Sequence, residues 1–183
     1  MSYLRSLNSN AGLLEVFQAS PQAARPLLEY HQLLLRDESP FTTGERELIA
    51  AYVSRLNNCN YCSAVHSQTA VALGIAADAM ANLLSNSQDE YVDRRMRPVL
   101  AFVRKLTLSP GYITATDVNA IFDAGWDDRA LHNAVAICAL FNLMNRLVNG
   151  LGIQASDEYT RMAAERLADR GYAQLLELLP ASK

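Results

Sequence analysis

Two cysteines and a histidine stand close together in the sequence at the spacing C-x2-C-x3-H. They are Cys59, Cys62 and His66. Residues three, four and seven positions apart share one face of a helix, so the two thiols and the imidazole should point the same way. Thiol pairs at this spacing are typical of redox-active and metal-binding sites. A dithiol that cycles to a disulfide is the first hypothesis.

The thiol pair is expected at the start of a helix. It follows Asn57-Asn58, residues suited to end one helix and cap the next, and the new helix should run to Gly74. The unpaired N–H groups and positive dipole end at a helix start favour the thiolate. Because the helix face is half apolar, we expect Cys62 to be partly shielded and Cys59 to lie nearer to solvent, where a protein reductant could meet it.

Such a pair could reduce a hydroperoxide. A thiolate at Cys62 would attack the O–O bond, the leaving alkoxide would need an acid, and the sulfenic acid would need a second thiol before it over-oxidised. Cys59 could supply both the proton and the second thiol. His66, one turn beyond Cys62, could stabilise the thiolate or pass the proton onward.

Zinc is the main alternative use of these residues. Tetrahedral zinc takes four ligands, usually from separated segments, whereas Cys59, Cys62 and His66 supply three from one helix. The sequence has no second Cys/His pair to complete the set. A redox couple is therefore favoured over a metal site, but a zinc-binding or redox-sensing interaction module without turnover stays open.

The remaining cysteine and histidines carry weaker signals. Cys138 lies in the apolar run 134–140 and is predicted to be a buried structural thiol. His31 and His132 are isolated in sequence, and surface or satisfied core positions are expected for both. The sequence lacks a G-x-G-x-x-G motif, and neither a nucleotide nor another cofactor is expected.

The composition predicts one domain spanning residues 1–183. Half of the residues are hydrophobic and 19% are charged, which is enough for one substantial core. The net charge of −3 gives no reason to expect nucleic acid or a membrane surface as partner. No apolar run reaches the roughly 18 residues that span a bilayer, and three cysteines do not resemble a disulfide framework. We therefore expect a cytoplasmic protein.

The hydrophobic pattern predicts an all-α fold, because apolar residues recur every three or four positions and no strand pattern stands out. Pro21 should open a helix, Thr42 and Glu45 form a capping-box pattern, Asp127 or Asp128 can cap a long apolar helix, and Ser109-Pro110-Gly111 should break one. The helices are expected at about 12–18, 21–36, 43–57, 60–74, 76–86, 88–107, 115–124, 127–149, 156–169 and 171–179.

A weak internal similarity, called the echo below, raises the possibility of a repeat. When the sequence is aligned with itself at an offset of 83 residues, Asp128-Arg129-Ala130-Leu131 aligns with Glu45-Arg46-Glu47-Leu48. Three asparagines then align with Cys59, Cys62 and His66. Two copies of a helix pair, one reactive and one holding amides, would give this pattern, although chance agreement would give it equally well. The asparagines are Asn142, Asn145 and Asn149.

The motif Cys59-x2-Cys62-x3-His66 resembles the AhpD-like branch of the carboxymuconolactone decarboxylase family, and most of all its peroxidase-related enzymes. The fuller pattern of that branch is Glu-x11-Cys-x2-Cys-x3-His, and counting back from Cys59 places Glu47 at the required position. The resemblance covers about residues 40–75. It implies an AhpD-like orthogonal bundle of helices and a thiol-dependent alkylhydroperoxidase or disulfide reductase with an antioxidant role.

The same resemblance implies roles for four residues. Cys62 would be oxidised to the sulfenic acid, Cys59 would donate the proton and close the disulfide, and Glu47 with His66 would relay protons. Without the resemblance Glu47 would be predicted as an exposed carboxylate. It shares a helix face with small residues, however, so a helix folding back on that face would let Glu47 reach His66.

The resemblance also implies partners and marks one departure. By similarity to AhpD, the dithiol partner would be a lipoyl-bearing protein or a peroxiredoxin. The resemblance also implies a homo-oligomer, in which the partner is a second copy of the chain. AhpD sequences carry a histidine directly before the second cysteine, where this chain has Tyr61, a poor proton carrier that is expected to serve in packing. The decarboxylase branch works without a cysteine pair, so decarboxylation ranks low.

Overall fold

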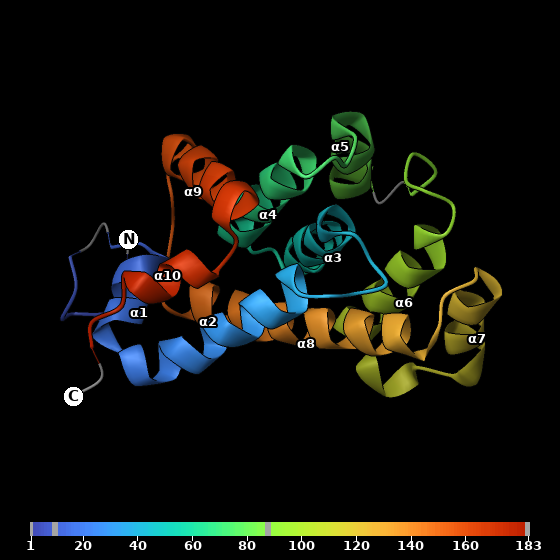
Figure 1. Ribbon diagram of the computed structural model, residues 1–183, viewed down its shortest axis with the longest axis horizontal. Helices are drawn as coiled ribbons and strands as arrows, with labels where there is room; N and C mark the ends of the chain where they lie inside the picture. Colours follow the sequence, from blue (N-terminus) through green and yellow to red (C-terminus); the bar gives the residue numbers. More distant parts are fainter. Residues whose placement is uncertain (1, 9–10, 87–88, 182–183) are drawn as a thin grey trace.

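The computed structural model describes residues 2–8, 11–86 and 89–181, and within these ranges the chain forms helices and no strand. Figure 1 shows them as one bundle in which neighbouring helices cross at steep angles. The elements are α1 (Leu13–Ala19), α2 (Pro21–Arg36), α3 (Thr43–Leu56), α4 (Asn60–Ala72), α5 (Ala77–Asn86), α6 (Met96–Leu108), the 3-10 turn η1 (Pro110–Tyr112), α7 (Ala115–Asp123), α8 (Asp128–Gly150), α9 (Asp157–Arg170) and α10 (Ala173–Glu177).

The expected all-α fold is confirmed, and the sequence signals for helix ends hold. Thr42 accepts a hydrogen bond from the Glu45 N–H, and Glu45 accepts one from the Thr42 N–H at 2.7 Å. Asp127 caps α8 by accepting from the Ala130 N–H at 2.9 Å. The helix expected over 88–107 is wrong at its start: residue 88 lies outside the described residues, and α6 begins only at Met96. The Asp93 carboxylate accepts from the Arg95 N–H at 2.8 Å, which stabilises a turn there instead.

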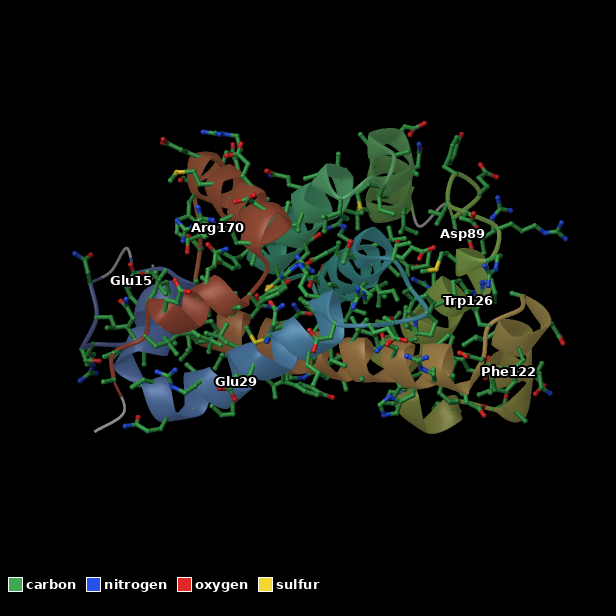
Figure 2. The ribbon with its side chains drawn as sticks, in the orientation of Figure 1. Glu15, Glu29, Asp89, Phe122, Trp126 and Arg170 are labelled. Carbon is green, nitrogen blue, oxygen red and sulfur yellow. The ribbon has the colours of Figure 1, made fainter. Side chains whose placement is uncertain are left out.

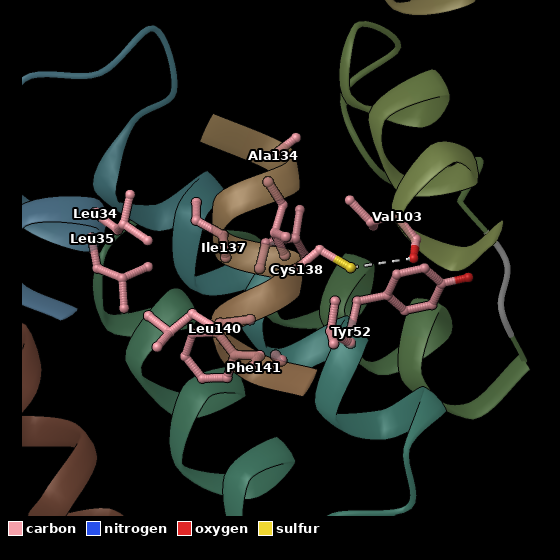
Figure 3. Close-up of a cluster of buried hydrophobic side chains, with 14 of the residues drawn as sticks. Leu34, Leu35, Tyr52, Val103, Ala134, Ile137, Cys138, Leu140 and Phe141 are labelled. Carbon is pink, nitrogen blue, oxygen red and sulfur yellow. Dashed lines mark hydrogen bonds between the residues drawn. The ribbon is translucent and has the colours of Figure 1, made fainter. Parts of the chain in front are cut away.

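Helix α8 is the centre of the bundle. It lies along the long axis of the molecule, behind α2 and below α3 in Figure 1, and Figure 3 shows its apolar residues packed among Leu34, Leu35, Tyr52 and Val103. By length and composition alone α8 could cross a membrane, but half of its most apolar window is buried inside this fold. Charged residues such as Glu29 and Arg170 lie exposed on the outside of the bundle (Figure 2).

The possible repeat of a helix pair, left open by the sequence, is not found in the structure. Residues 128–150 form the single helix α8, whereas the segment aligned with them is divided between α3 and α4 by a turn at 57–59. The asparagines of the echo instead form a polar row on α8 that contacts this turn. Asn57 donates to the side-chain oxygens of Asn142 and Asn145 at 3.1 and 3.0 Å, and Asn149 donates to the Asn57 carbonyl at 3.4 Å.

Helices α3 and α4 pack closely against each other, and α9 lies across α4 on its other side (Figure 1). The close approach depends on Gly44 in the first turn of α3. A Cβ added there would lie 2.8 Å from the backbone oxygen of Leu73, just after α4. Moving backbone atoms apart would cost packing between the helices. The glycine at this position therefore permits the short distance between α3 and α4, which carry the predicted site.

Replacing Gly44 with alanine should therefore lower stability. We expect Gly44→Ala to cost about 1–3 kcal/mol through overpacking, which corresponds to a drop in Tm of roughly 2–12 °C for a chain of this size. The matched control is Gly111→Ala, since a Cβ at Gly111 would meet nothing within 4 Å. Thermal unfolding followed by circular dichroism tests this, and equal Tm values for the two variants would contradict it.

Candidate active site

The two cysteines of the motif lie at the start of α4, as the sequence predicts. Helix α3 ends at Leu56, the chain reverses at Asn58 with φ of 54°, and Cys59 is the N-cap of α4 with Cys62 in its first turn. Asparagine tolerates this left-handed conformation better than most residues. The Cys59 N–H donates to the Ser54 carbonyl at 2.9 Å, which ties the turn to the end of α3.

The two sulfurs lie 2.7 Å apart, close enough for one thiol to donate a hydrogen bond to the other. This hydrogen bond lowers the pKa of Cys59 and raises the pKa of Cys62. The two thiols therefore titrate as a pair, in which loss of the first proton favours retention of the second. The Asn145 side chain lowers the pKa of both thiols by favouring their charged form. Once the first proton is lost, the two sulfurs can share the remaining proton across the short contact.

The expected exposure of Cys59 is wrong, whereas the expected shielding of Cys62 is found. Cys59 is 0% exposed, because the N-cap residue is covered by an apolar cluster that contains Val16, Val148 and Ile153. Cys62 is 3% exposed and lines a cavity of about 80 Å³. The sulfur that an external molecule can approach is therefore that of Cys62, with Cys59 behind it.

The cavity is enclosed mainly by apolar side chains from α1, α2, α4, α8, α9 and the segment that leads into α10. Besides Cys62, its polar lining comprises both buried histidines, His31 and His66, together with Tyr61, Tyr159, Tyr172 and Arg166. A small pocket of this kind, apolar with a few convergent polar groups, is typical of a ligand site.

Glu47 is fully buried and joins several segments of the chain. The His66 Nδ1–H donates to Glu47 Oε2 at 2.6 Å, the Tyr172 hydroxyl donates to Oε1 at 2.9 Å, and Arg36 Nη2 lies 2.7 Å from Oε1. Burial opposes the charge, but His66 and Arg36 outweigh it, so the pKa of Glu47 lies below its usual value. The predicted reach from Glu47 to His66 is confirmed, whereas an exposed carboxylate is not found.

Sequence reasoning missed Arg36 and Tyr172, which lie 11 and 125 positions from Glu47. Gln32 holds the backbone of Tyr172 by accepting from the N–H groups of Tyr172 and Ala173 at 2.9 and 3.1 Å. Gly171 precedes them with φ of 65°, and a Cβ there would lie 2.8 Å from the Gln32 side-chain oxygen. A glycine before a tyrosine after α9 is the only sequence signal of this arrangement.

The two histidines left out of the predicted site have different places. His132 is exposed. His31 is 3% exposed, and its Nδ1–H donates to the Leu27 carbonyl at 2.7 Å. Burial lowers the pKa of His31 to about 4, and the bond to Leu27 only partly offsets this. The expected core position of His31 is thus found, and its Nδ1 is paired as expected. Its ring also lines the cavity, which the sequence did not predict.

Cys138 and Tyr61 match their predictions. Cys138 is buried in α8, contacts the Thr107 hydroxyl at 3.3 Å, and has its pKa raised by burial (Figure 3). The Tyr61 ring packs 6.2 Å from the ring of Tyr159, and burial raises its pKa well above its usual value. Tyr61 therefore stays protonated and contributes packing to the cavity wall.

The donor set does not favour zinc. Within residues 2–8, 11–86 and 89–181, no three His, Cys, Asp or Glu side chains are gathered in a way that could hold a metal ion. The Nδ1–H of His66 is already committed to Glu47. The geometry thus provides a thiol pair rather than a tetrahedral cage.

Comparison with known proteins points to one family. Residues 21–101 match the carboxymuconolactone decarboxylase family. The chain is similar to this family over those residues and has the AhpD-like fold. A search of curated proteins found no match.

Solved structures support the same assignment. A peroxidase-related protein from Silicibacter sp. TM1040 is 25% identical, with a TM-score of 0.76 over 81% of this chain and 78% of the other. The alkylhydroperoxidase AhpD core of a peroxidase-related protein from Ralstonia eutropha JMP134 is 26% identical, with a TM-score of 0.75 over the same shares. A debrominase bound to 2,3,4-tribromopyrrole shares the fold at 16% identity, with a TM-score of 0.70 over 82% of this chain and 81% of that one.

The buried state of His31 predicts loss of stability in acid. Between pH 6.5 and about 4 the unfolded chain binds a proton at this histidine that the folded chain does not, so stability falls as the pH falls through this range. The shift from 6.5 to about 4 corresponds to about 3 kcal/mol. We expect His31→Gln to lose about that much less stability than the unmodified protein between pH 7 and pH 4.

Urea unfolding at several pH values measures this difference. His132→Gln is the control, because His132 is exposed, and it should follow the unmodified protein throughout. Glu47 adds its own acid sensitivity, since its lowered pKa stabilises the fold above its unfolded pKa and this is lost as pH falls. This contribution of Glu47 is the same in the unmodified protein, His31→Gln and His132→Gln, so it cancels in the comparison. Parallel curves for His31→Gln and the control would refute the assignment.

Proposed function

We propose that the protein is a thiol-dependent peroxidase that reduces organic hydroperoxides and turns over through a Cys59–Cys62 disulfide. The observation that carries the proposal is the position of Cys62 on the wall of an apolar cavity, with the Cys59 sulfur 2.7 Å behind it. The peroxidase-related solved structures, at 25% and 26% identity, support the same reaction class.

The first step oxidises Cys62. When the shared proton lies on Cys59, the Cys62 thiolate attacks the terminal oxygen of the hydroperoxide, the S–O bond forms and the O–O bond breaks. The bonding pair leaves on the alkoxide, which takes a proton and departs as the alcohol. His66 lines the cavity, and its ring, held by the Glu47 carboxylate, is placed to relay that proton.

The second step closes the disulfide. The Cys59 sulfur, already in contact with Cys62, attacks the sulfenic sulfur and releases its oxygen as water. Both electrons delivered to the peroxide thus come from the two thiols. A dithiol reductant, such as a lipoyl-bearing protein, then restores the pair, or the protein in turn reduces a peroxiredoxin.

Because Cys59 is fully buried, the reductant should form its mixed disulfide with Cys62. This reverses the expectation from sequence that Cys59 meets the reductant. A slender dithiol arm fits a cavity of about 80 Å³ better than a cysteine on a flat protein surface. Dihydrolipoamide, thioredoxin and glutathione tested against a panel of hydroperoxides would identify the donor. A single oxidation with no turnover under any donor would instead favour a redox sensor.

Serine variants should separate the two sulfurs. Cys62→Ser should abolish hydroperoxide consumption, because no other thiol lines the cavity. Cys59→Ser should react once and stop at a sulfenic acid, which dimedone traps and mass spectrometry detects. Cys138→Ser is the control and should retain full turnover, since its thiol lies away from the cavity. Equal residual turnover in the first two variants would contradict the assigned roles.

Loss of the Glu47 charge should affect both rate and stability. We expect Glu47→Gln to lower kcat/KM about 10- to 100-fold through weaker charge support for His66. It should also destabilise the fold by about 3 kcal/mol or more, because the partly buried Arg36 would lose its carboxylate partner. The matched control is Glu29→Gln, which changes an exposed carboxylate on α2. Peroxide assays and urea unfolding of both variants test this, and unchanged values for Glu47→Gln would overturn it.

A further inference from the structure

Two imidazoles line the same cavity as Cys62, and they are held in different ways. The Nδ1–H of His66 donates to a carboxylate, Glu47. The Nδ1 atom of His31 lies 2.7 Å from the Leu27 carbonyl, an atom that can only accept, so His31 must carry its proton on Nδ1. One histidine therefore has an anionic partner and the other a neutral one.

The proton on Nδ1 fixes the state of the other ring nitrogen of His31. In the neutral ring Nε2 is a bare acceptor, and among the described residues no donor pairs with it. Burial of the whole side chain keeps the ring neutral, with a pKa of about 4. The ring is fixed between Tyr172, at 5.2 Å between ring centroids, and Phe141, at 5.9 Å. A rigid acceptor thus belongs to the lining of a mainly apolar cavity.

The cavity offers few other groups that could serve instead. Tyr61 and Tyr172 keep their hydroxyl protons, because burial raises the pKa of both, and Tyr172 uses its proton on Glu47. His66, Tyr159 and Arg166 also line the cavity, and Arg166 has no acceptor atom on its side chain. A tyrosine hydroxyl can accept as well as donate, whereas Nε2 of the neutral His31 ring can only accept. His31 is therefore well suited to a ligand that donates a hydrogen bond.

We propose that His31 is a further substrate-binding residue, which accepts a hydrogen bond from the terminal O–H of the hydroperoxide and directs that oxygen toward Cys62. This rests on the proposed peroxidase function. The terminal oxygen is the atom that Cys62 attacks, and its hydrogen stays on it as the S–O–H group forms. His31 thus orients the substrate and takes up no proton, while the alkoxide leaves with a proton from elsewhere.

The two imidazoles then divide the work on the O–O bond. The neutral ring of His31 binds the oxygen that joins sulfur, and the ring paired with Glu47 supplies the proton for the departing oxygen. The two rings differ in their partners, a carboxylate for His66 and a backbone carbonyl for His31, and this difference is the basis of the division. A hydrogen bond to His31 would favour hydroperoxides over dialkyl peroxides as substrates, because only a hydroperoxide carries the O–H group.

The test compares two electrophiles on the reduced protein. Ethyl hydroperoxide carries the O–H donor, whereas methyl methanethiosulfonate has none and reports the reactivity of the Cys62 sulfur alone. His31→Leu should slow the reaction of Cys62 with ethyl hydroperoxide about 10- to 100-fold. Its reaction with methyl methanethiosulfonate should stay within about twofold. Peptide mass spectrometry distinguishes Cys62 from Cys59 and Cys138.

Two further variants keep the test decisive. His31→Gln offers an amide oxygen as acceptor and should recover part of the rate with ethyl hydroperoxide, and it serves alone if the leucine variant fails to fold. His132→Leu should leave both reactions unchanged. Equal slowing with both electrophiles, or an unchanged rate with ethyl hydroperoxide, would overturn the role of His31 while the peroxidase function stands. An unmodified protein that reacts only with methyl methanethiosulfonate would overturn both.

Discussion

The buried carboxylate of Glu47 is the interaction on which the rest of the site depends. A charge with no exposed surface is costly unless it is paired and hydrogen-bonded. Here the partners come from three segments: Arg36 at the end of α2, His66 in α4 and Tyr172 just before α10. Since none of these segments can move away without leaving the charge uncompensated, one carboxylate fixes the relative positions of the elements that surround the cavity.

The same constraint orients the cysteine pair. His66 lies on the same helix as Cys62, so holding the imidazole against Glu47 fixes the rotation of α4 about its axis. At the start of α4 the row of asparagines on α8 holds the turn that carries Cys59. The helix is thus secured at both ends of the motif. The sulfurs stay in contact while the cavity side of Cys62 stays open.

Local sequence rules were enough for the helices and for part of the site. The capping residues Thr42 and Asp127 mark true helix starts, and the spacing of Glu47, Cys59, Cys62 and His66 predicts a contact that the structure contains. Arg36, Tyr172 and His31 could not be found in this way, because their roles arise from packing between segments distant in sequence. The exposure of Cys59 was misjudged for the same reason, since a helical wheel shows one helix and not the α1 and α8 residues that cover its start.

The depth of Cys59 also constrains the order of events in the proposed cycle. Because only Cys62 borders the cavity, the hydroperoxide and the reductant must approach the same sulfur through the same space. They cannot bind together, so each half-reaction has to finish before the next begins. An enclosed apolar site also keeps water from the sulfenic acid while Cys59 attacks it. Burial of Cys59 therefore separates the oxidation step from the reduction step. The Cys62 sulfur reacts with both external molecules, whereas the Cys59 sulfur reacts only with Cys62.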